Sequence, residues 1–368
     1  MQKIIRLSSN LFLTNTWLLL LGFLVAIPAC KKPPEPGKNY QEVNLVANTD
    51  EYHAARIDAN FINGWGIAFG PSGVAWVSAN GSGISEVWDK DGNQLIPAVT
   101  IPSPGNSTMG GQPTGQVFNG TSDFKLTNGN PARFIFAGLN GIISGWNGGS
   151  SAEIAVNDSK SGAVYPGIAL AQDGGSNFLY VANFSAHKID VYDKNWTEVN
   201  KPFKDPNIPG NYSPFNIQNV QGKLFVMYAK IGSDGNEVHG AGLGIVDIYN
   251  PDGSLDKRFA SHGSLNSPWG VAAAPLGFWG DNDKDDLAGV ILVGNFGDGR
   301  INAFDKWGHL LGQLKSKGKT LEIEGLWGIS FPPSTATTVD PGRLYFAAGP
   351  DEETHGLFGY IINKTKGE

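Results

Sequence analysis

The chain has 368 residues, with 27 Lys and Arg against 34 Asp and Glu, so its formal net charge is −7 at pH 7. An acidic chain without a basic stripe argues against nucleic acid as a partner. Fifty Gly, ten Trp and a single Cys favour many short strands joined by tight turns, and they exclude an intramolecular disulfide.

The first thirty residues have the pattern of an export signal. Lys3 and Arg6 precede an apolar stretch over Trp17–Ile27, which is too short to span a bilayer of about 30 Å. Cys30 follows a small residue at the end of that stretch and resembles the lipidated cysteine of a bacterial lipobox. We therefore expect residues 1–30 to be a lipoprotein signal peptide; the alternative is ordinary secretion with a chance cysteine.

Residues 31–42 begin with KKPPEPGK, a Pro-rich polar segment that cannot join a sheet. We expect this segment to be a tether that holds the following domain off the membrane, with the lipid anchor as the only membrane contact. The predicted location is the bacterial cell envelope, either periplasmic or on the cell surface.

One unit recurs six times after residue 43. Its clearest copy is Ser267–Asp305, where Gly-rich and Asn-rich segments separate three short apolar runs, as in a meander of antiparallel strands. Units with a period of roughly 40 to 50 residues and about four strands are typical of propeller blades. The sequence therefore predicts an all-β fold, a single six-bladed β-propeller over residues 43–362. The start of each unit is marked at Gly66, Gly115, Gly167, Asn216, Gly270 and Gly328.

Three strands are expected in every unit. The opening strands are Trp65–Phe69, Thr114–Phe118, Gly167–Ala171, Phe215–Val220, Trp269–Ala274 and Trp327–Phe331. The second strands are Ala75–Ala79, Phe134–Gly138, Phe178–Ala182, Lys223–Tyr228, Gly289–Gly294 and Arg343–Ala347. The third strands are Ile84–Asp89, Ile142–Asn147, Lys188–Asp193, Gly244–Tyr249, Arg300–Phe304 and Leu357–Ile361.

The outer, fourth strand is clear at Gln94–Ile101 but is missing from the last unit, which is followed only by a tail over residues 363–368. An apolar run without a partner, Val43–Asn48, lies ahead of the first unit. We expect this run to complete the sixth blade and close the ring, because closure removes both open sheet edges.

Several segments also carry a resemblance: Gln112–Asn119, Ala132–Asn147, Tyr180–Asp193, Ser213–Lys230, Gly294–Asp305 and Gly356–Ile361. Together they resemble a family of secreted bacterial six-bladed propellers whose blade pattern is similar to that of NHL-repeat proteins. The resemblance implies the propeller fold over essentially all of the chain after the signal. It implies no activity, because none is established for that family.

One face of the predicted propeller collects polar and aromatic side chains. The starts of first strands and the turns between second and third strands share this face, called here the top face. A concave apolar floor ringed by polar groups is typical of a small-ligand site; the alternative is that each Asn occupies a turn and each Trp packs between blades. The candidate ligand-binding residues are Asn63, Trp65, Asn80, Gln112, Asn140, Tyr165, Asn183, Asn216, Trp269, Asn295, Asp298, Trp327 and Asp351.

Two groups of residues raise the question of a metal. Carboxylates stand at alternating positions, as in a calcium loop, so Asp281, Asp283 and Asp285 are candidate ligands of a Ca²⁺ ion. The alternative is a plain solvated acidic turn. Three histidines fall in turns of the top face, but on blades too far apart to share an ion, so we expect them to be solvated. They are His187, His239 and His355.

The sequence contains no G-x-S-x-G, H-E-x-x-H or P-loop motif. We therefore expect a monomeric, noncatalytic module that binds a glycan, a peptide or an envelope protein. The alternative is a metal-dependent, lactonase-like hydrolase or lyase with its ion on the propeller axis, an idea supported by fold analogy alone. His, Asp or Glu converging on the axis would favour the enzyme, and an axis lined by Asn, Gly and apolar groups would favour binding.

Overall fold

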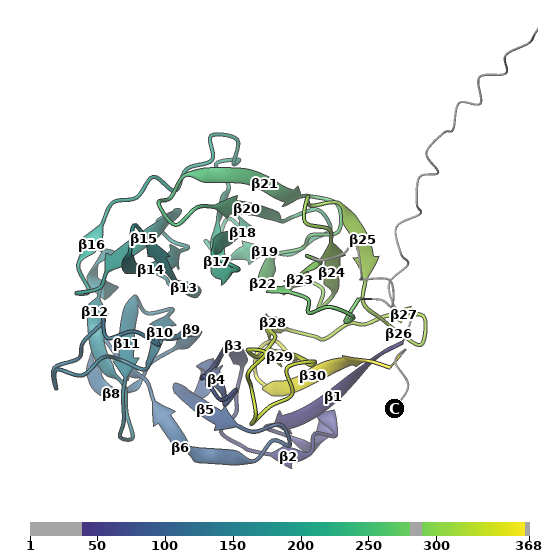
Figure 1. Cartoon of the computed structure of the whole chain (residues 1–368), viewed down its shortest axis with the longest axis horizontal. Helices are drawn as coiled ribbons and strands as arrows, with labels where there is room; N and C mark the ends of the chain where they lie inside the picture. Colours follow the sequence, from purple (N-terminus) through teal and green to yellow (C-terminus); the bar gives the residue numbers. More distant parts are fainter. Residues whose placement is uncertain (1–38, 280–288, 365–368) are drawn as a thin grey trace, which may run out of the picture. The chain divides into compact units, whose positions relative to one another are not determined.

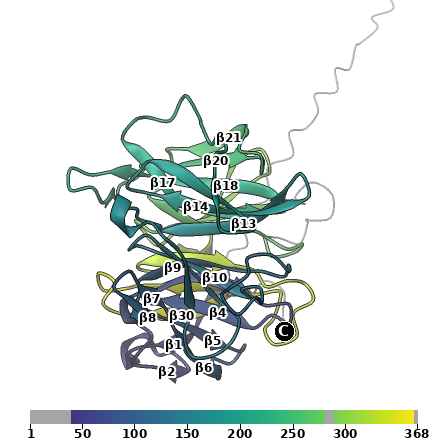
Figure 2. The same cartoon turned by 90° about the vertical axis from the view of Figure 1, so that its left-hand side faces the viewer.

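The computed structural model describes residues 39–279 and 289–364. Its main sheets are antiparallel and surround a common axis as six blades, so the predicted propeller is confirmed (Figure 1). Figure 2 shows these blades edge-on, with β20 and β21 of the fourth blade above and β5 and β6 of the first below. No helix in the described part is long and apolar enough to cross a membrane.

The first three blades each have four strands. Blade 1 consists of β3 (Gly64–Phe69), β4 (Ala75–Ala79), β5 (Ile84–Trp88) and β6 (Gln94–Thr100). Blade 2 consists of β9 (Pro113–Phe118), β10 (Phe134–Gly138), β11 (Ile142–Trp146) and β12 (Glu153–Asn157). Blade 3 consists of β13 (Gly167–Asp173), β14 (Ser176–Asn183), β15 (Lys188–Asp193) and β16 (Glu198–Val199).

The next two blades continue the pattern. Blade 4 consists of β17 (Tyr212–Val220), β18 (Lys223–Ile231), β20 (Ile245–Tyr249) and β21 (Leu255–Ser261), and the short β19 (Glu237–Val238) pairs with β18. Blade 5 consists of β22 (Pro268–Ala273), β23 (Ile291–Asn295), β24 (Ile301–Phe304) and β25 (Leu310–Gln313). The sequence did not predict several short pieces. Between the blades lie β7 (Pro102–Ser103), β8 (Asn106–Gly110), β26 (Lys315–Ser316), β27 (Lys319–Thr320) and η3 (Ser159–Ser161), and η2 (Asn80–Ser82) lies in the β4–β5 turn of blade 1.

The ring closes through blade 6, as predicted. This blade joins β28 (Leu326–Ser330), β29 (Leu344–Ala348) and β30 (Leu357–Asn363) to β1 (Tyr40–Ala47), which runs antiparallel to β30. β1 begins three residues before the expected strand, because Tyr40 is buried and its hydroxyl donates to the Phe278 carbonyl at 2.9 Å. The chain then passes through η1 (Asp50–Tyr52) and β2 (Arg56–Ile57), which pairs with β1 in parallel.

Close packing at the axis explains the glycine that marks each repeat. A Cβ added to Gly66 would lie 2.5 Å from the Thr114 carbonyl oxygen, and one added to Gly328 would lie 2.6 Å from that of Trp65. Real Cβ atoms do not approach other atoms so closely, so the innermost strands can meet only where the side chain is absent. The exception is Asn216 in blade 4, whose amide bonds to the next blade.

The core lies between the blades and follows the alternation of the strands. In β18, Leu224 and Val226 pack toward blade 3, whereas Phe225 and Met227 pack toward blade 5. Successive side chains of a strand point to opposite faces of its sheet, so the second strands, which are covered on both faces, carry apolar side chains on both.

Candidate functional site

A cavity of about 720 Å³ opens on the top face at blades 4, 5 and 6. The β18–β20 loop, the β23–β24 turn, the link into β28 and the β29–β30 turn form its wall. Six of its side chains are carboxylates, and no Lys or Arg is among the described residues that line it. The ionisable and aromatic side chains of the cavity are Glu237, His239, Phe296, Asp298, Glu322, Glu324, Glu352 and Glu353.

The β29–β30 turn that forms one wall is held in an unusual backbone conformation. Asp351, Glu352 and Glu353 have φ values of 54°, 52° and 67°. A left-handed conformation costs a non-glycine residue roughly 1–2 kcal/mol, so three in succession persist only where the surroundings enforce them. Such outliers gather at functional sites, and this one brings Glu352 and Glu353 to the cavity.

Glu353 is the most constrained carboxylate of the cavity. The Asn63 side-chain amide donates from Nδ2 to Glu353 Oε2 at 2.6 Å, and Trp327 Nε1 donates to Asn63 Oδ1 at 3.1 Å. Burial raises the pKa of Glu353 and the charge of Glu237 raises it further, although the Asn63 bond acts in the opposite direction. Two predicted residues, Asn63 and Trp327, therefore position a carboxylate that the sequence did not single out.

The sequence analysis also named His239 and Asp298, and both line the cavity. His239 Nε2 lies 3.5 Å from Glu237 Oε1, and its ring packs edge-on against Phe296 at 5.0 Å. Asp298 Oδ1 accepts from the Asn295 side-chain amide at 3.0 Å, which fixes the β23–β24 turn. The cavity thus combines an imidazole with carboxylates that could accept hydrogen bonds from a cation.

The predicted apolar floor is a packed aromatic cluster at the axis. Trp65 stacks on Trp327 at 3.6 Å, and Phe296 stacks on the other side of Trp327 at 3.8 Å. Trp269 completes the group and donates from Nε1 to the Pro166 carbonyl of blade 3 at 3.1 Å. The three Trp side chains are only 1–3% exposed, so they offer no open ring face on which a sugar could stack.

Other predicted residues bond neighbouring parts of the ring together. The amide of Asn80 donates to the Pro113 carbonyl at 3.1 Å, which joins blade 1 to blade 2, and the amide of Asn216 donates to the Trp269 carbonyl at 2.8 Å. Asn295 is fully buried and donates to Ser264 at 2.8 Å. Among the remaining candidates Gln112 and Asp351 are exposed and Asn140 is half-buried.

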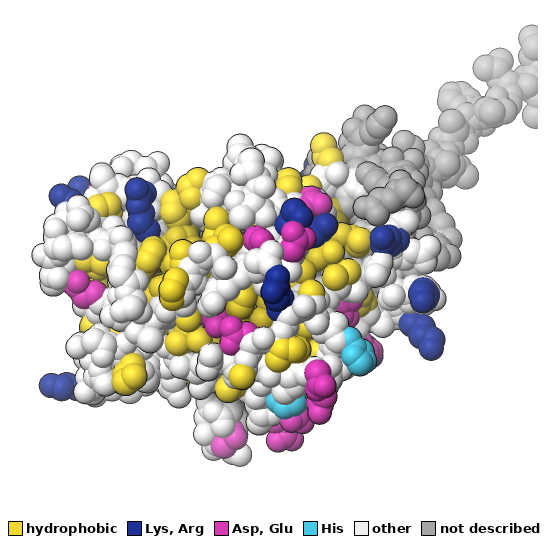
Figure 3. Space-filling model, turned by 90° about the horizontal axis from the view of Figure 1, so that it is seen from below, with side chains coloured by type: hydrophobic (Ala, Val, Ile, Leu, Met, Phe, Trp, Pro, Cys, Tyr) yellow, Lys and Arg dark blue, Asp and Glu magenta, His cyan; other side chains and the backbone are white. Residues whose placement is uncertain are grey.

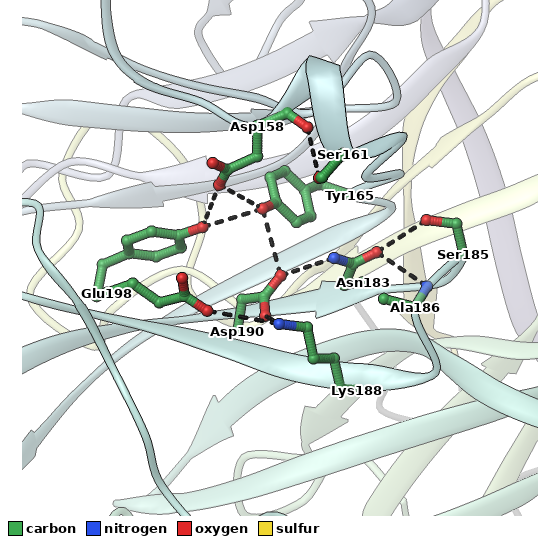
Figure 4. Close-up of polar contacts among 10 residues, drawn as sticks. Asp158, Ser161, Tyr165, Asn183, Ser185, Ala186, Lys188, Asp190 and Glu198 are labelled. Carbon is green, nitrogen blue, oxygen red and sulfur yellow. Dashed lines mark hydrogen bonds and ion pairs between the residues drawn. The ribbon is translucent and has the colours of Figure 1, made fainter.

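Tyr165 and Asn183 meet in a buried network between blades 2 and 3 (Figure 4). The Tyr165 hydroxyl lies 2.8 Å from Asp158 Oδ2, and the Asn183 amide donates to Asp190 Oδ2 at 2.7 Å. Lys188 Nζ pairs with Asp190 Oδ1 at 2.6 Å. Burial raises the pKa of Tyr165, so its hydroxyl stays a donor. Through these contacts Tyr165 and Asn183 connect the segment between β12 and β13 to β15.

Asp190 belongs to a set of buried polar residues that the sequence did not identify. Each stands at the same register of a third strand, opposite the central apolar residue of the second strand. Asp190 contacts Tyr165 in the segment that precedes blade 3. Asp247 pairs with Arg258, which also pairs with Asp205 in the segment that precedes blade 4. The matching positions are Glu86, Ser144, Asp190, Asp247 and Asn302, all at most 4% exposed.

The propeller axis itself is lined by small, amide and apolar residues. Gln116 donates to the Gly66 carbonyl at 2.8 Å, and the Val271 amide donates to Gln218 Oε1 at 2.7 Å, so these amides join neighbouring blades. A cavity of about 20 Å³ lies there. Among the described residues that line this cavity there is no His, Asp or Glu.

The candidate metal ligands fall into two sets. Asp281, Asp283 and Asp285 lie outside the described residues, as does Cys30. The three histidines lie in top-face turns of blades 3, 4 and 6, as predicted. Within residues 39–279 and 289–364 no group of three or more His, Cys, Asp or Glu could hold a metal ion.

His355 lies beside one hydroxyl group and two carboxylates. Its Nδ1 shares a 2.9 Å hydrogen bond with the Tyr52 hydroxyl, and carboxylates of Glu51 and Asp351 lie 3.9 Å from its ring nitrogens. The space-filling view of the side formed by blades 1 and 6 shows acidic and histidine side chains gathered in its lower part (Figure 3).

Comparison with known proteins identifies relatives without an assigned activity. No protein-family model matches the chain. Two uncharacterized proteins of Acanthamoeba polyphaga mimivirus, R648 and L690, are each 33% identical to it over 341 residues, which is 87% of this chain and 80% and 85% of theirs. These relatives are viral, whereas the sequence resemblance pointed to a bacterial family.

Solved structures share the architecture. A streptogramin B lyase superposes with a TM-score of 0.51 at 14% identity, covering 89% of this chain and 99% of its own. A protein of unknown function from Bacteroides thetaiotaomicron superposes with a TM-score of 0.53 at 11% identity, covering 88% of this chain and 76% of its own. At such low identity the likeness shows the fold alone.

Proposed function

The chain belongs to the same family as these two mimivirus proteins, a family of β-propellers of unknown function, and we propose that it is a lipid-anchored extracytoplasmic module that binds a cationic polypeptide segment in its top-face cavity. The observation that carries the proposal is the cavity lined by six carboxylates, one wall of which is the left-handed turn Asp351–Glu353. Glu322 is paired with Arg300 at 2.8 Å, but no Lys or Arg is among the described residues that line the cavity, so its other carboxylates complement a cation better than a neutral ligand.

A peptide fits this cavity better than the glycan that the sequence also suggested. Protein sites for small ligands typically measure 300–1,000 Å³, so about 720 Å³ accommodates a few side chains of a peptide. Lys and Arg side chains form charge-assisted hydrogen bonds with carboxylates such as Glu237 and Glu324. The aromatic side chains that suggested a glycan, Trp65, Trp269 and Trp327, are buried beneath the surface and offer a sugar no ring face on which to stack.

A titration of a Lys- and Arg-rich peptide tests the proposal. The cavity variant carries Glu237→Gln, Glu324→Gln and Glu352→Gln. The matched control removes the same charge near the opposite face, at Asp91 and Asp252 in turns and at Asp256 near the start of β21. We expect the cavity variant to bind at least tenfold more weakly than the control, and added salt to weaken binding by the unmodified protein. Equal losses in both variants, or equally tight binding of an acidic peptide, would refute a specific site.

A hydrolase or lyase is the second candidate, and it rests on Glu353. A carboxyl group with a raised pKa beside an imidazole can act as a general acid, so Glu353 with His239 is the candidate acid–base pair. The axial ion of the sequence-based alternative lacks this kind of support, because the described axial residues provide no carboxylate or imidazole. Loss of turnover in Glu353→Gln, with binding of the cationic peptide unchanged, would favour the enzyme over the binding module.

A further inference from the structure

The ring closure fixes the face from which the chain leaves the propeller. β30 starts beside the cavity turn on the top face and ends on the opposite, bottom face. Since β1 is antiparallel to β30, Tyr40 lies opposite Asn363 on the bottom face and Ala47 lies opposite Leu357 on the top face. The seven residues of β30 separate these two levels by about 20 Å. Asn39 therefore leaves the domain on the side away from the cavity.

The segment between the predicted lipid and the domain is short. Nine residue steps from Cys30 to Asn39 span at most about 32 Å when fully extended. A path from the bottom face over the edge of blade 6 would use about 20 Å of this length before it reached the level of the cavity. About 12 Å would then remain, so a lipid on Cys30 has more reach when the bottom face lies next to the bilayer than when the top face does.

The exposed apolar side chains of the described residues lie mainly on that same side. Leu276 in the β22–β23 turn is 74% exposed, and Trp307 in the β24–β25 turn is 60% exposed. Both turns are on the bottom face of blade 5, and Leu95 and Leu310, 42% and 50% exposed, stand near the bottom-face ends of β6 and β25. Four of the six large apolar side chains that are exposed thus gather toward the bottom face.

We propose that the bottom face is a docking surface for a lipid bilayer, with Trp307 and Leu276 in the headgroup region and the acidic cavity turned away from the membrane. The inference rests on the lipid anchor of the proposed function, and it adds a surface contact to that anchor. Trp suits the membrane interface because its ring is apolar with one polar edge. Lys306 Nζ lies 4.6 Å from the Trp307 ring and can reach toward lipid phosphates.

The test measures how close each face comes to the bilayer. Full-length acylated protein is reconstituted into phosphatidylcholine vesicles that contain brominated lipids, which quench a fluorophore only on contact. Neutral lipid is used because Asp252 and Asp305 also lie in bottom-face turns. A fluorophore is attached at Leu276→Cys on the bottom face or, as the matched probe, at Thr354→Cys on the top face. We expect loss of fluorescence at position 276 and none at position 354.

Two outcomes would overturn the inference while leaving the anchor intact. In the first, the label at position 354 is quenched as strongly as the label at position 276. In the second, the protein is acylated but its label at position 276 is not quenched. A further variant, Trp307→Ser, should keep the vesicle binding that the lipid provides and lose quenching at 276; unchanged quenching would exclude the proposed contact. If mass spectrometry finds Cys30 without a lipid, the anchor and the docking surface are both refuted, whereas peptide binding by the cavity is tested independently.

Discussion

The carboxyl group of Glu86 should make the propeller less stable as the pH rises. Glu86 is a third-strand polar residue of β5, 1% exposed, and it faces Asp58 in the link before blade 1. Burial first, and the charge of Asp58 second, raise its pKa from 4.5 to about 8. We expect Glu86→Gln to remove this sensitivity, because an uncharged amide matches the protonated acid in size and can donate to Asp58.

The sign and the size follow from the two pKa values. The folded state keeps the Glu86 proton up to about pH 8, whereas the unfolded chain releases it near pH 4.5. The stabilisation is therefore fully present below pH 4.5 and is lost as the pH rises to 8, at about 1.4 kcal/mol per pH unit. The loss amounts to roughly 3 kcal/mol at pH 7 and roughly 5 kcal/mol above pH 8.

Urea unfolding followed by Trp fluorescence between pH 4.5 and 8.5 measures this effect. The free energy of unfolding of Glu86→Gln minus that of the unmodified protein should increase with pH by several kcal/mol. Other buried carboxyl groups, such as Asp247 with its pKa raised to about 7, titrate in both proteins and cancel in the difference. The exposed Glu198→Gln serves as the control. A difference that does not change with pH would refute the reasoning.

Two further substitutions test the ring. Arg258→Leu leaves Asp205 and Asp247 without their shared cation, so we expect a loss of about 3–5 kcal/mol in the free energy of unfolding, measured by urea titration; a loss below 1 kcal/mol would show that the pair is dispensable. Gly66→Ala forces a Cβ against the Thr114 carbonyl, and we expect a cost of about 1–3 kcal/mol and a lower melting temperature by calorimetry, whereas Gly105→Ala, in open space, should leave it unchanged. Equal melting temperatures for the two alanine variants would contradict the packing argument.

The architecture could be predicted from sequence because its physical causes repeat. The glycine at the start of a unit recurs because neighbouring inner strands touch there, as the contact of Gly66 with Thr114 shows. The closing strand was visible because an apolar run ahead of the first unit had no partner. β1 pairs with β30 through a bulge between Asn44 and Val46, which a repeat pattern does not encode.

The cavity could not be predicted in the same way. Glu237 lies in the two-residue strand β19, and Glu324 lies in a link between blades, so neither has a position that recurs in other units. Glu353 depends on a left-handed backbone that nothing in its composition signals. By contrast, the buried polar residues could have been found, because aligning the third strands places Glu86 and Asp247 at the same register.

The closing strand has a consequence for the order of assembly. Among the described strands β1 is the first to be synthesised, and its partner β30 is the last; Asn48 and Gly356, which bond at 3.0 Å beside this pair, are 308 residues apart in the chain. Five blades can form by local pairing, but the sixth must wait until β30 has been synthesised. Until then β1 presents a bare apolar edge. Moving this strand to the C-terminus by circular permutation should therefore speed the final folding phase and reduce aggregation of the nascent chain.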